Sequence, residues 1–361
     1  MLISDCFSAS YAEAREKFRD AARATGAVLE VYRNPATGPD GLALTTDTAR
    51  LGPREAQRLL IVMSGTHGVE GFCGSGVQVA LLKSGVAGQR PPDAALLMIH
   101  AINPSGFAWT RRVTEGNVDL NRNFVDHGRP YPVNREYELL REAICPSDWS
   151  AKGRAAADAI LAAYEAAHGT MALQTAISAG QFIDPAGLFY GGQAPSWSNR
   201  TLREILRREV VGTRHVAFID LHSGLGPNGV GEIINNHVSG SPGFQRVKQW
   251  FGAEATSSEE GNSASAVVIG TADIALDEAL PQAAVTGITL EYGTVPVRDL
   301  LEALRADNWL HKHGRRDSAQ GRAITARLRH VFYPDTDVWR AMVWERANDV
   351  VRRALQGVSQ S

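Results

Sequence analysis

The sequence has few cysteines and no long apolar run. Cys6, Cys73 and Cys145 are its only cysteines, and none belongs to a C-x-x-C pair. A set this sparse and odd in number argues against a disulfide framework and a cysteine metal site, and it favours a reducing compartment. No run of about 18 apolar residues is present, and the N-terminus lacks the apolar segment of a signal peptide. We therefore expect a cytoplasmic protein that does not enter a membrane.

The chain also lacks an excess of charge of either sign. Lys and Arg number 37 against 39 Asp and Glu, for a formal net charge of −2. Without a basic field or a polybasic stretch, neither nucleic acid nor a membrane surface is an expected partner. A small-molecule amide or a short peptide fits better, and the sequence leaves homo-oligomerisation open.

Strand and helix patterns alternate along the chain. Residues 59–63, 94–99 and 215–221 are uninterrupted apolar runs, as in strands that are covered on both faces. Weaker strand patterns occur at 28–32, 42–48, 266–269 and 288–290. Alternation of this kind predicts an α/β fold with a largely parallel sheet.

The sequence shows no internal repeat or break in composition, so we predict one domain over residues 1–361. A helical insertion is expected at about 134–200, and a helical C-terminal region at about 297–361. The irregular stretch 189–199 precedes a helix that Ser198 or Asn199 could cap.

Polar residues appear just past the carboxyl ends of the apolar strands, at His67, His100, His222 and Glu291. In open α/β sheets, that edge is where sites form. These positions are therefore the first candidates for chemistry.

His67 and Glu70 stand three residues apart in the glycine-rich turn 66–71. An imidazole nitrogen and a carboxylate oxygen suit a divalent metal, and the glycines let the backbone bring both towards one point. His222 is the natural third ligand, which completes the His₂Glu set found in catalytic zinc sites. Asp220, two residues earlier, can support a ligand imidazole from behind.

Other charged residues suit the remaining tasks of a hydrolytic site. Glu291 ends an apolar strand, and a partly desolvated carboxylate beside a metal can act as a general base towards water. Arg111, Arg112 and Arg122 lie in a long loop segment where a substrate anion could dock, because guanidinium forks suit carboxylates.

These residues belong to an ordered series of motifs: His67-x-x-Glu70, Asn103-Pro104-Ser105-Gly106, Asp119-Leu120-Asn121-Arg122-Asn123-Phe124, Asp220-Leu221-His222-Ser223 and Thr289-Leu290-Glu291. The series resembles the zinc carboxypeptidase superfamily, which includes the aspartoacylase and succinylglutamate desuccinylase deacylases. The resemblance covers about residues 59–295, and its most specific part is D-L-N-R-N-F followed by D-L-H. The stretch from Gly191 to Asn199 resembles a bacterial branch rather than the digestive enzymes.

The resemblance implies one zinc ion per chain, held by His67, Glu70 and His222, with Glu291 activating the water. It also implies a mixed, mostly parallel, eight-stranded twisted sheet sandwiched between helices.

For the substrate, the resemblance implies that Asn121 and Arg122 grip a terminal carboxylate. Arg111 or Arg112 would match the arginine that polarises the scissile carbonyl. Spacing does not choose between them, and we favour Arg112.

The chain departs from the digestive enzymes at two places. Val69 stands where they carry an arginine, and residues 258–290 contain no tyrosine to match their mobile one. Both changes favour a small N-acyl amino acid or modified dipeptide over an extended peptide. Tyr190 or Trp197 is the candidate to close the pocket instead.

The sequence therefore predicts a zinc-dependent hydrolase, either a metallocarboxypeptidase or an N-acyl amino acid amidohydrolase. One alternative is a non-catalytic metal- or ligand-binding protein of the same fold, although such a protein has no need of Glu291. A serine hydrolase using Ser64, Ser75 or Ser223 is disfavoured because no G-x-S-x-G motif is present.

Overall fold

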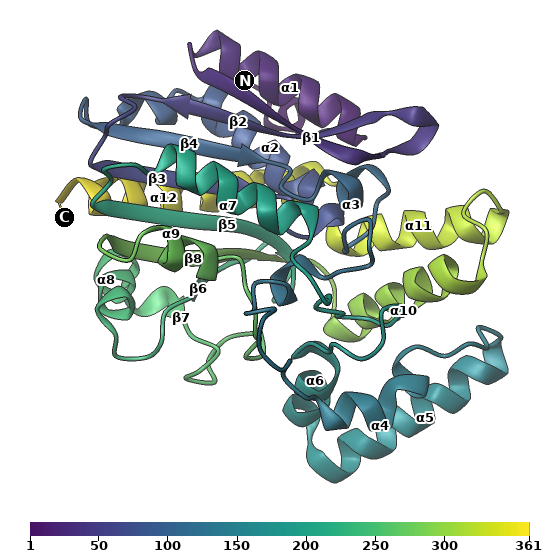
Figure 1. Ribbon diagram of the computed structural model, residues 1–361. Coiled ribbons are helices and arrows are strands. Elements are labelled where there is room, and N and C mark those ends of the chain that lie inside the picture. The colour runs from purple at the N-terminus through teal and green to yellow at the C-terminus, as the bar shows by residue number, and fades with distance from the viewer. Residues whose placement is uncertain (361) are drawn as a thin grey trace.

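The structure is a computed structural model that describes residues 1–360, and its centre is a mixed sheet between helical layers (Figure 1). The strands are β1 (Val28–Thr37), β2 (Ala43–Leu51), β3 (Arg58–Ser64), β4 (Ala94–His100), β5 (His215–Gly224), β6 (Gly231–Asn235), β7 (Ala255–Thr256) and β8 (Ala284–Gly293). Across the sheet their order is β1-β2-β4-β3-β5-β8-β6-β7. The pairs β3–β4, β3–β5, β5–β8 and β6–β7 are parallel, and the other pairs are antiparallel. The predicted α/β fold is confirmed.

Residues 59–63 of strand β3 show why the central strands carry continuous apolar runs. Leu60 and Val62 face a core shared with α1 (Tyr11–Ala24), α2 (Gly71–Lys83), α8 (Pro242–Phe251) and α12 (Asp337–Gln360). Leu59, Ile61 and Met63 face the opposite core, which includes residues of α7 (Trp197–Glu209) and α9 (Ile274–Ala279). A strand covered on both faces buries every side chain, and each aliphatic one contributes about 1.5–3 kcal/mol.

The remaining helices are α3 (Pro104–Ala108), α4 (Arg135–Ile144), α5 (Ala151–His168), α6 (Thr170–Ser178), α10 (Val297–His313) and α11 (Ala319–Phe332). Figure 1 shows α4–α6 together with α10 and α11 beyond one end of the sheet. Helices thus occupy much of the two segments where the sequence predicted an insertion and a helical C-terminal region. The cap of α7 is Ser196 rather than Ser198 or Asn199, because the Ser196 hydroxyl accepts from the Asn199 amide at 3.2 Å.

The sequence misplaced the strands at one edge of the sheet. Residues 266–269 were predicted as a strand, but they form an irregular loop in which Val267 and Ile269 are about half exposed. Strands β6 and β7 occupy that edge instead, where β6 pairs with β8. A strand needs a neighbouring strand to which its backbone can hydrogen-bond, and the apolar pattern does not show whether one is present. The pattern at 266–269 therefore predicted a strand wrongly.

Over residues 1–360, no helix has both the length and the apolar character that a bilayer crossing needs. Cys6, Cys73 and Cys145 are all buried and unpaired.

The turn after β3 is held by close backbone contacts. The amides of Gly68 and Val69 donate to the carbonyls of Arg112 and Arg111 at 3.0 and 2.8 Å. A Cβ on Gly68 would lie 2.0 Å from the Gly106 carbonyl carbon in α3. Only glycine fits there, since the atoms that a side chain would meet are backbone.

We expect Gly68→Ala to lower the melting temperature, because the added methyl forces the turn away from α3. Overpacking of this kind costs about 1–3 kcal/mol. Gly88→Ala is the matched control, since a Cβ there meets nothing within 4 Å. Thermal unfolding of both variants is the measurement, and equal melting temperatures would contradict the close contact.

Candidate metal centre and active site

Three adjacent strands position the candidate residues. Strand β5 lies between β3 and β8, and all three run parallel. His67 follows the end of β3, while His222 in β5 is the register partner of Glu291 in β8. Directly paired residues place their side chains on the same side of a sheet, so His222 and Glu291 face the same space.

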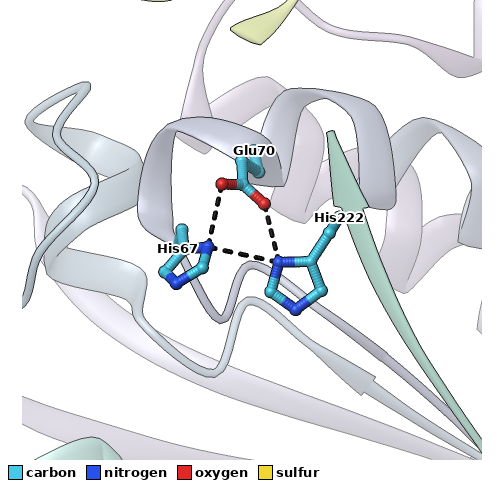
Figure 2. Close-up of side chains that lie close together, drawn as sticks. All are labelled: His67, Glu70 and His222. Carbon is cyan, nitrogen blue, oxygen red and sulfur yellow. Dashed lines mark hydrogen bonds and ion pairs between the residues drawn. The ribbon is translucent and has the colours of Figure 1, made fainter. Parts of the chain in front are cut away.

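His67, Glu70 and His222 form a tight buried group (Figure 2). The Nδ1 atoms of the two histidines lie 2.8 Å from the two carboxylate oxygens of Glu70 and 3.2 Å from each other. One ligand atom from each residue lies within 4.8 Å of the others. The sequence predicted that His67 and Glu70 lie beside His222, some 150 positions later in the chain, and the structure brings the three residues into contact.

The donor set fits a zinc ion. Two Nδ1 atoms facing each other at 3.2 Å repel unless a proton or a cation lies between them. In a tetrahedral zinc site with Zn–N bonds of about 2.0–2.1 Å, two nitrogen ligands lie about 3.3 Å apart. The observed spacing therefore matches two imidazoles that share one metal, with Glu70 as the anionic ligand.

The far nitrogen of each histidine faces a carboxylate. His222 Nε2 lies 2.8 Å from Asp220 Oδ2, and Asp220 also accepts from the Thr66 hydroxyl at 2.8 Å. His67 Nε2 lies 3.3 Å from Asp119 Oδ1. Carboxylates in these places favour the tautomer with the proton on Nε2, which leaves Nδ1 free for a metal.

Asp119 is the residue of this group that sequence reasoning missed. It lies within the D-L-N-R-N-F motif but had been given no role. Its other oxygen accepts from Arg112 Nε at 2.9 Å. The signal was the motif itself, since Asp119 begins it.

Burial and charge set the protonation of the carboxylates. Burial alone would raise the pKa of Asp119, but Arg112 and Arg122 nearby hold it well below its usual range. Burial likewise opposes ionisation of Glu70, and the His67 and His222 imidazoles outweigh it and lower the pKa of Glu70.

Glu291 is shifted in the opposite direction. Burial, reinforced by the nearby Glu70 carboxylate, raises the pKa of Glu291 to about 8. One of its oxygens accepts from the Leu225 amide at 2.9 Å. A divalent cation between the histidines would favour the ionised form again, because it offsets the charge of Glu70.

A cavity of about 740 Å³ opens onto this group. Its lining includes His67, Glu70, His222, Glu291, Arg112, Asn121 and Arg122. The size suits a small molecule, since ligand pockets hold about 300–1,000 Å³.

Arg122 is a buried cation in this lining, 4% exposed. Its Nε donates to the Ser178 carbonyl and its Nη1 to the Asn121 carbonyl, both at 2.9 Å, and its Nη2 also contacts Ser178. Within the described residues no carboxylate lies in ion-pair range of it, and burial lowers its pKa to about 10. Of five guanidinium donors, one N–H on each Nη is left for a ligand.

The alternation of polar and apolar residues over 119–124 predicts a short extended segment. The structure instead has a 3₁₀ turn there, Leu120–Arg122, which holds Arg122. The Asn121 side chain accepts from the Ala272 amide at 3.0 Å, which ties the turn to the loop before α9.

The two neighbouring arginines separate. Arg112 lines the cavity, with Nη1 3.3 Å from Glu70. Arg111 instead pairs with Asp307 in α10 at 2.8 Å and does not line the cavity.

Tyr190 and Trp197, the predicted pocket-closing residues, also lie outside the cavity lining. Phe189 takes that place, and the guanidinium groups of Arg112 and Arg122 lie 5.3 and 5.5 Å from its ring centroid. Phe189 has a φ of +52°, a strained value for a non-glycine residue and a frequent mark of functional sites.

His100 does not join the other strand-end residues. Its Nε2 lies 2.8 Å from the Ser75 hydroxyl, and both residues are buried, with Phe18 stacked on the imidazole ring. Neither Ser75 nor His100 lines the cavity. This pair therefore offers no accessible serine nucleophile.

The chain belongs to a family described as Protein of unknown function (DUF2817), whose model matches residues 7–346. No curated protein matches it. Thrombin activatable fibrinolysis inhibitor (TAFI) matches in structure with a TM-score of 0.50 and 13% identity, over 98% of this chain and 75% of that one.

Two further solved structures are similar at lower scores. Carboxypeptidase A from Helicoverpa armigera matches with a TM-score of 0.45 and 14% identity, over 91% of this chain and 75% of that one. Succinylglutamate desuccinylase from Chromobacterium violaceum matches with a TM-score of 0.38 and 15% identity, over 91% and 76%. At 13% identity the likeness to TAFI concerns the fold alone. The similar solved structures include a carboxypeptidase and a succinylglutamate desuccinylase, which are the kinds of protein that the sequence resembles.

We expect Asp220→Ala to weaken zinc binding about 10–100-fold, the usual cost of losing the carboxylate behind a ligand imidazole. Competition with a chromogenic chelator measures this affinity. Asp126→Ala is the control, because Asp126 is exposed and pairs with Arg129 away from the site. Unchanged zinc affinity in Asp220→Ala would show that His222 needs no such support.

Proposed function

We propose that this member of the DUF2817 family is a zinc-dependent hydrolase that cleaves an amide bond in a small substrate with a free carboxylate. The proposal is carried by one observation: the group His67, Glu70 and His222 shares a cavity with Glu291 and with the unpaired cation Arg122. Metal ligands, a base and an anion-binding group are the parts that such a reaction requires.

In this proposal His67, Glu70 and His222 would hold a zinc ion, which would supply Lewis acidity towards a water molecule and the scissile carbonyl. Glu291 takes one proton from the attacking water and passes it to the leaving nitrogen as the C–N bond breaks. Arg112 donates to the oxygen that gains negative charge. The products are a carboxylic acid and an amine, and water is the only co-reactant.

The substrate's carboxylate is assigned to Arg122. Its two remaining N–H groups can bind two oxygens, and Phe189 and the Ser178 carbonyl keep the guanidinium from turning away. A buried arginine that has no carboxylate in ion-pair range is costly, so a bound carboxylate offsets that cost.

A non-catalytic metal-binding protein is the second candidate. Against it stands the position of Glu291, which lines the cavity as the register partner of a metal-binding histidine. Binding a metal or a ligand needs His67, Glu70, His222 and Arg122, but it does not need a general base.

Chelation and Glu291→Gln together test the proposal on N-acyl amino acids and dipeptides. A chelator should abolish hydrolysis and added zinc should restore it. Glu291→Gln should keep its zinc and lose about 10²–10⁴-fold in kcat, because the amide is the same size but not basic.

The matched control is Glu232→Gln. Glu232, in strand β6, is the register partner of Glu291 on the other side of β8 from His222, but it does not line the cavity. Hydrolysis that survives in both variants would exclude Glu291 as the base, and absence of hydrolysis of any amide by the zinc-loaded parent would favour a binding protein.

Arg122→Lys separates carboxylate recognition from chemistry. Lysine keeps the charge but cannot form two parallel hydrogen bonds, so kcat/KM on a free acid should fall by roughly one to two powers of ten. On the matching substrate with an amidated carboxylate, the same variant should lose little. Both substrates are assayed with both proteins, and equal losses would mean that Arg122 serves the fold or the chemistry.

A further inference from the structure

Arg112 and Arg122 contact the same aromatic ring, that of Phe189. Their guanidinium carbons lie 5.3 and 5.5 Å from the centroid of this ring. The face of an aromatic ring carries partial negative charge and attracts a guanidinium group within about 6 Å. The attraction is strongest where water is excluded, and Phe189 and Arg122 are only 7% and 4% exposed.

The ring lies beside two positive charges that repel each other. Burial lowers the pKa of Arg122 to about 10, Asp119 opposes this shift, and the charge of Arg112 adds to it. The Asp119 carboxylate accepts from Arg112 Nε at 2.9 Å, whereas the guanidinium of Arg122 donates to backbone carbonyls. The Phe189 ring is therefore a contact that the two cations share.

The backbone holds Phe189 against this pair. The Gln181 amide donates to the Phe189 carbonyl at 3.0 Å, and the Asp119 amide donates to the Tyr190 carbonyl at 2.8 Å. Asp119 thus binds the segment of Phe189 with its amide and Arg112 with its carboxylate. A φ of +52° persists only where the surroundings impose it, and these hydrogen bonds on both sides of Phe189 do so.

Packing holds the ring as well. Phe189 belongs to the buried cluster that includes Ile177 of α6, Leu304 of α10 and Phe332 of α11. Close packing leaves such a ring little freedom to move, so it presents a fixed surface to both guanidinium groups.

We propose that Phe189 is a positioning residue that holds Arg112 and Arg122 in a fixed relation through cation–π contacts. This inference rests on the proposed function, in which Arg122 binds the substrate's carboxylate and Arg112 donates to the carbonyl oxygen. A substrate presents these two groups at one separation, so a ring that holds both arginines aligns the scissile bond with Glu291. Phe189 itself takes no part in making or breaking bonds.

Two replacements of Phe189 separate the charge distribution of the ring from its bulk. Phe189→Leu keeps an apolar side chain but removes the ring. Pentafluorophenylalanine in place of Phe189 keeps the shape of the ring and reverses its charge distribution, so the packing remains while the attraction is lost.

Each replacement should lower kcat/KM on a free-acid N-acyl amino acid about fivefold to thirtyfold, with a higher KM and a lower kcat. On the matching substrate with an amidated carboxylate, only kcat should fall, because Arg122 has no carboxylate to bind there. Full activity of the pentafluorophenylalanine protein would overturn the proposal, since it would show that Phe189 contributes only bulk.

Phe251→Leu is the matched control. Phe251 of α8 is buried, and its ring centroid lies 5.2 Å from the guanidinium carbon of Arg353, but it does not line the cavity. The same substitution there removes a contact of the same kind and should leave kcat and KM unchanged. A loss equal to that of Phe189→Leu would mean that removal of any such buried ring lowers activity, which would also overturn the proposal.

Proton exchange keeps this test separate from the proposed function. In protein that carries isotope-labelled arginine, NMR follows the Nε protons of Arg112 and Arg122, which Arg112→Lys and Arg122→Lys assign. Exchange of these protons with water should be about fivefold to thirtyfold faster in both Phe189 variants, because guanidinium groups released from the ring open more often.

Unchanged exchange at either arginine overturns the proposal, whether or not the protein hydrolyses an amide. Faster exchange at both arginines, in a protein whose parent hydrolyses no amide, supports the positioning role of Phe189 and contradicts the hydrolase.

Discussion

Buried negative charge is the constraint on which the site depends. Glu70, Asp119, Asp220 and Glu291 lie close together, each at most 8% exposed. Carboxylates out of water are tolerated only when cations or hydrogen-bond donors balance them. Arg112 balances Asp119, both imidazoles face Glu70, and His222 also faces Asp220. Glu291 accepts from the Leu225 amide. A divalent cation between the Nδ1 atoms would complete that balance.

The sheet stabilises the fold enough to keep these charged side chains close together. Three parallel strands end side by side, and apolar cores on both faces hold them there. The helices beyond the strand ends, together with the loop before α9, then line the cavity with both apolar and polar side chains. The same fold hosts varied functions, so the chemistry has to be argued from this site rather than from the fold. Arg122 and Glu291 carry that argument. Burial disfavours the charged form of each side chain. A bound substrate anion offsets this cost at Arg122, and a proton offsets it at Glu291.

Much of the fold could be predicted because its strongest signals are local. Fully apolar runs such as 59–63 mark strands buried on both faces, and the order of motifs predicted that His67, Glu70 and His222 lie together. The edge of the sheet could not be predicted, since β6 is short and its place depends on pairing with β8 and β7. Residues 266–269 have a stronger strand pattern, yet no strand is available there to pair with them.

The sequence by itself determined which residue types can bind a metal and act as a base, because their spacing and strand-end positions are written in the chain. Only the tertiary structure decided between neighbours. Arg112 reaches the cavity while Arg111 pairs with Asp307, and Phe189 lines it while Tyr190 does not. Both choices fall in irregular segments, where no fixed period relates one side chain's direction to the next. There, direction depends on contacts made by residues far away in the chain, such as Asp307 in α10.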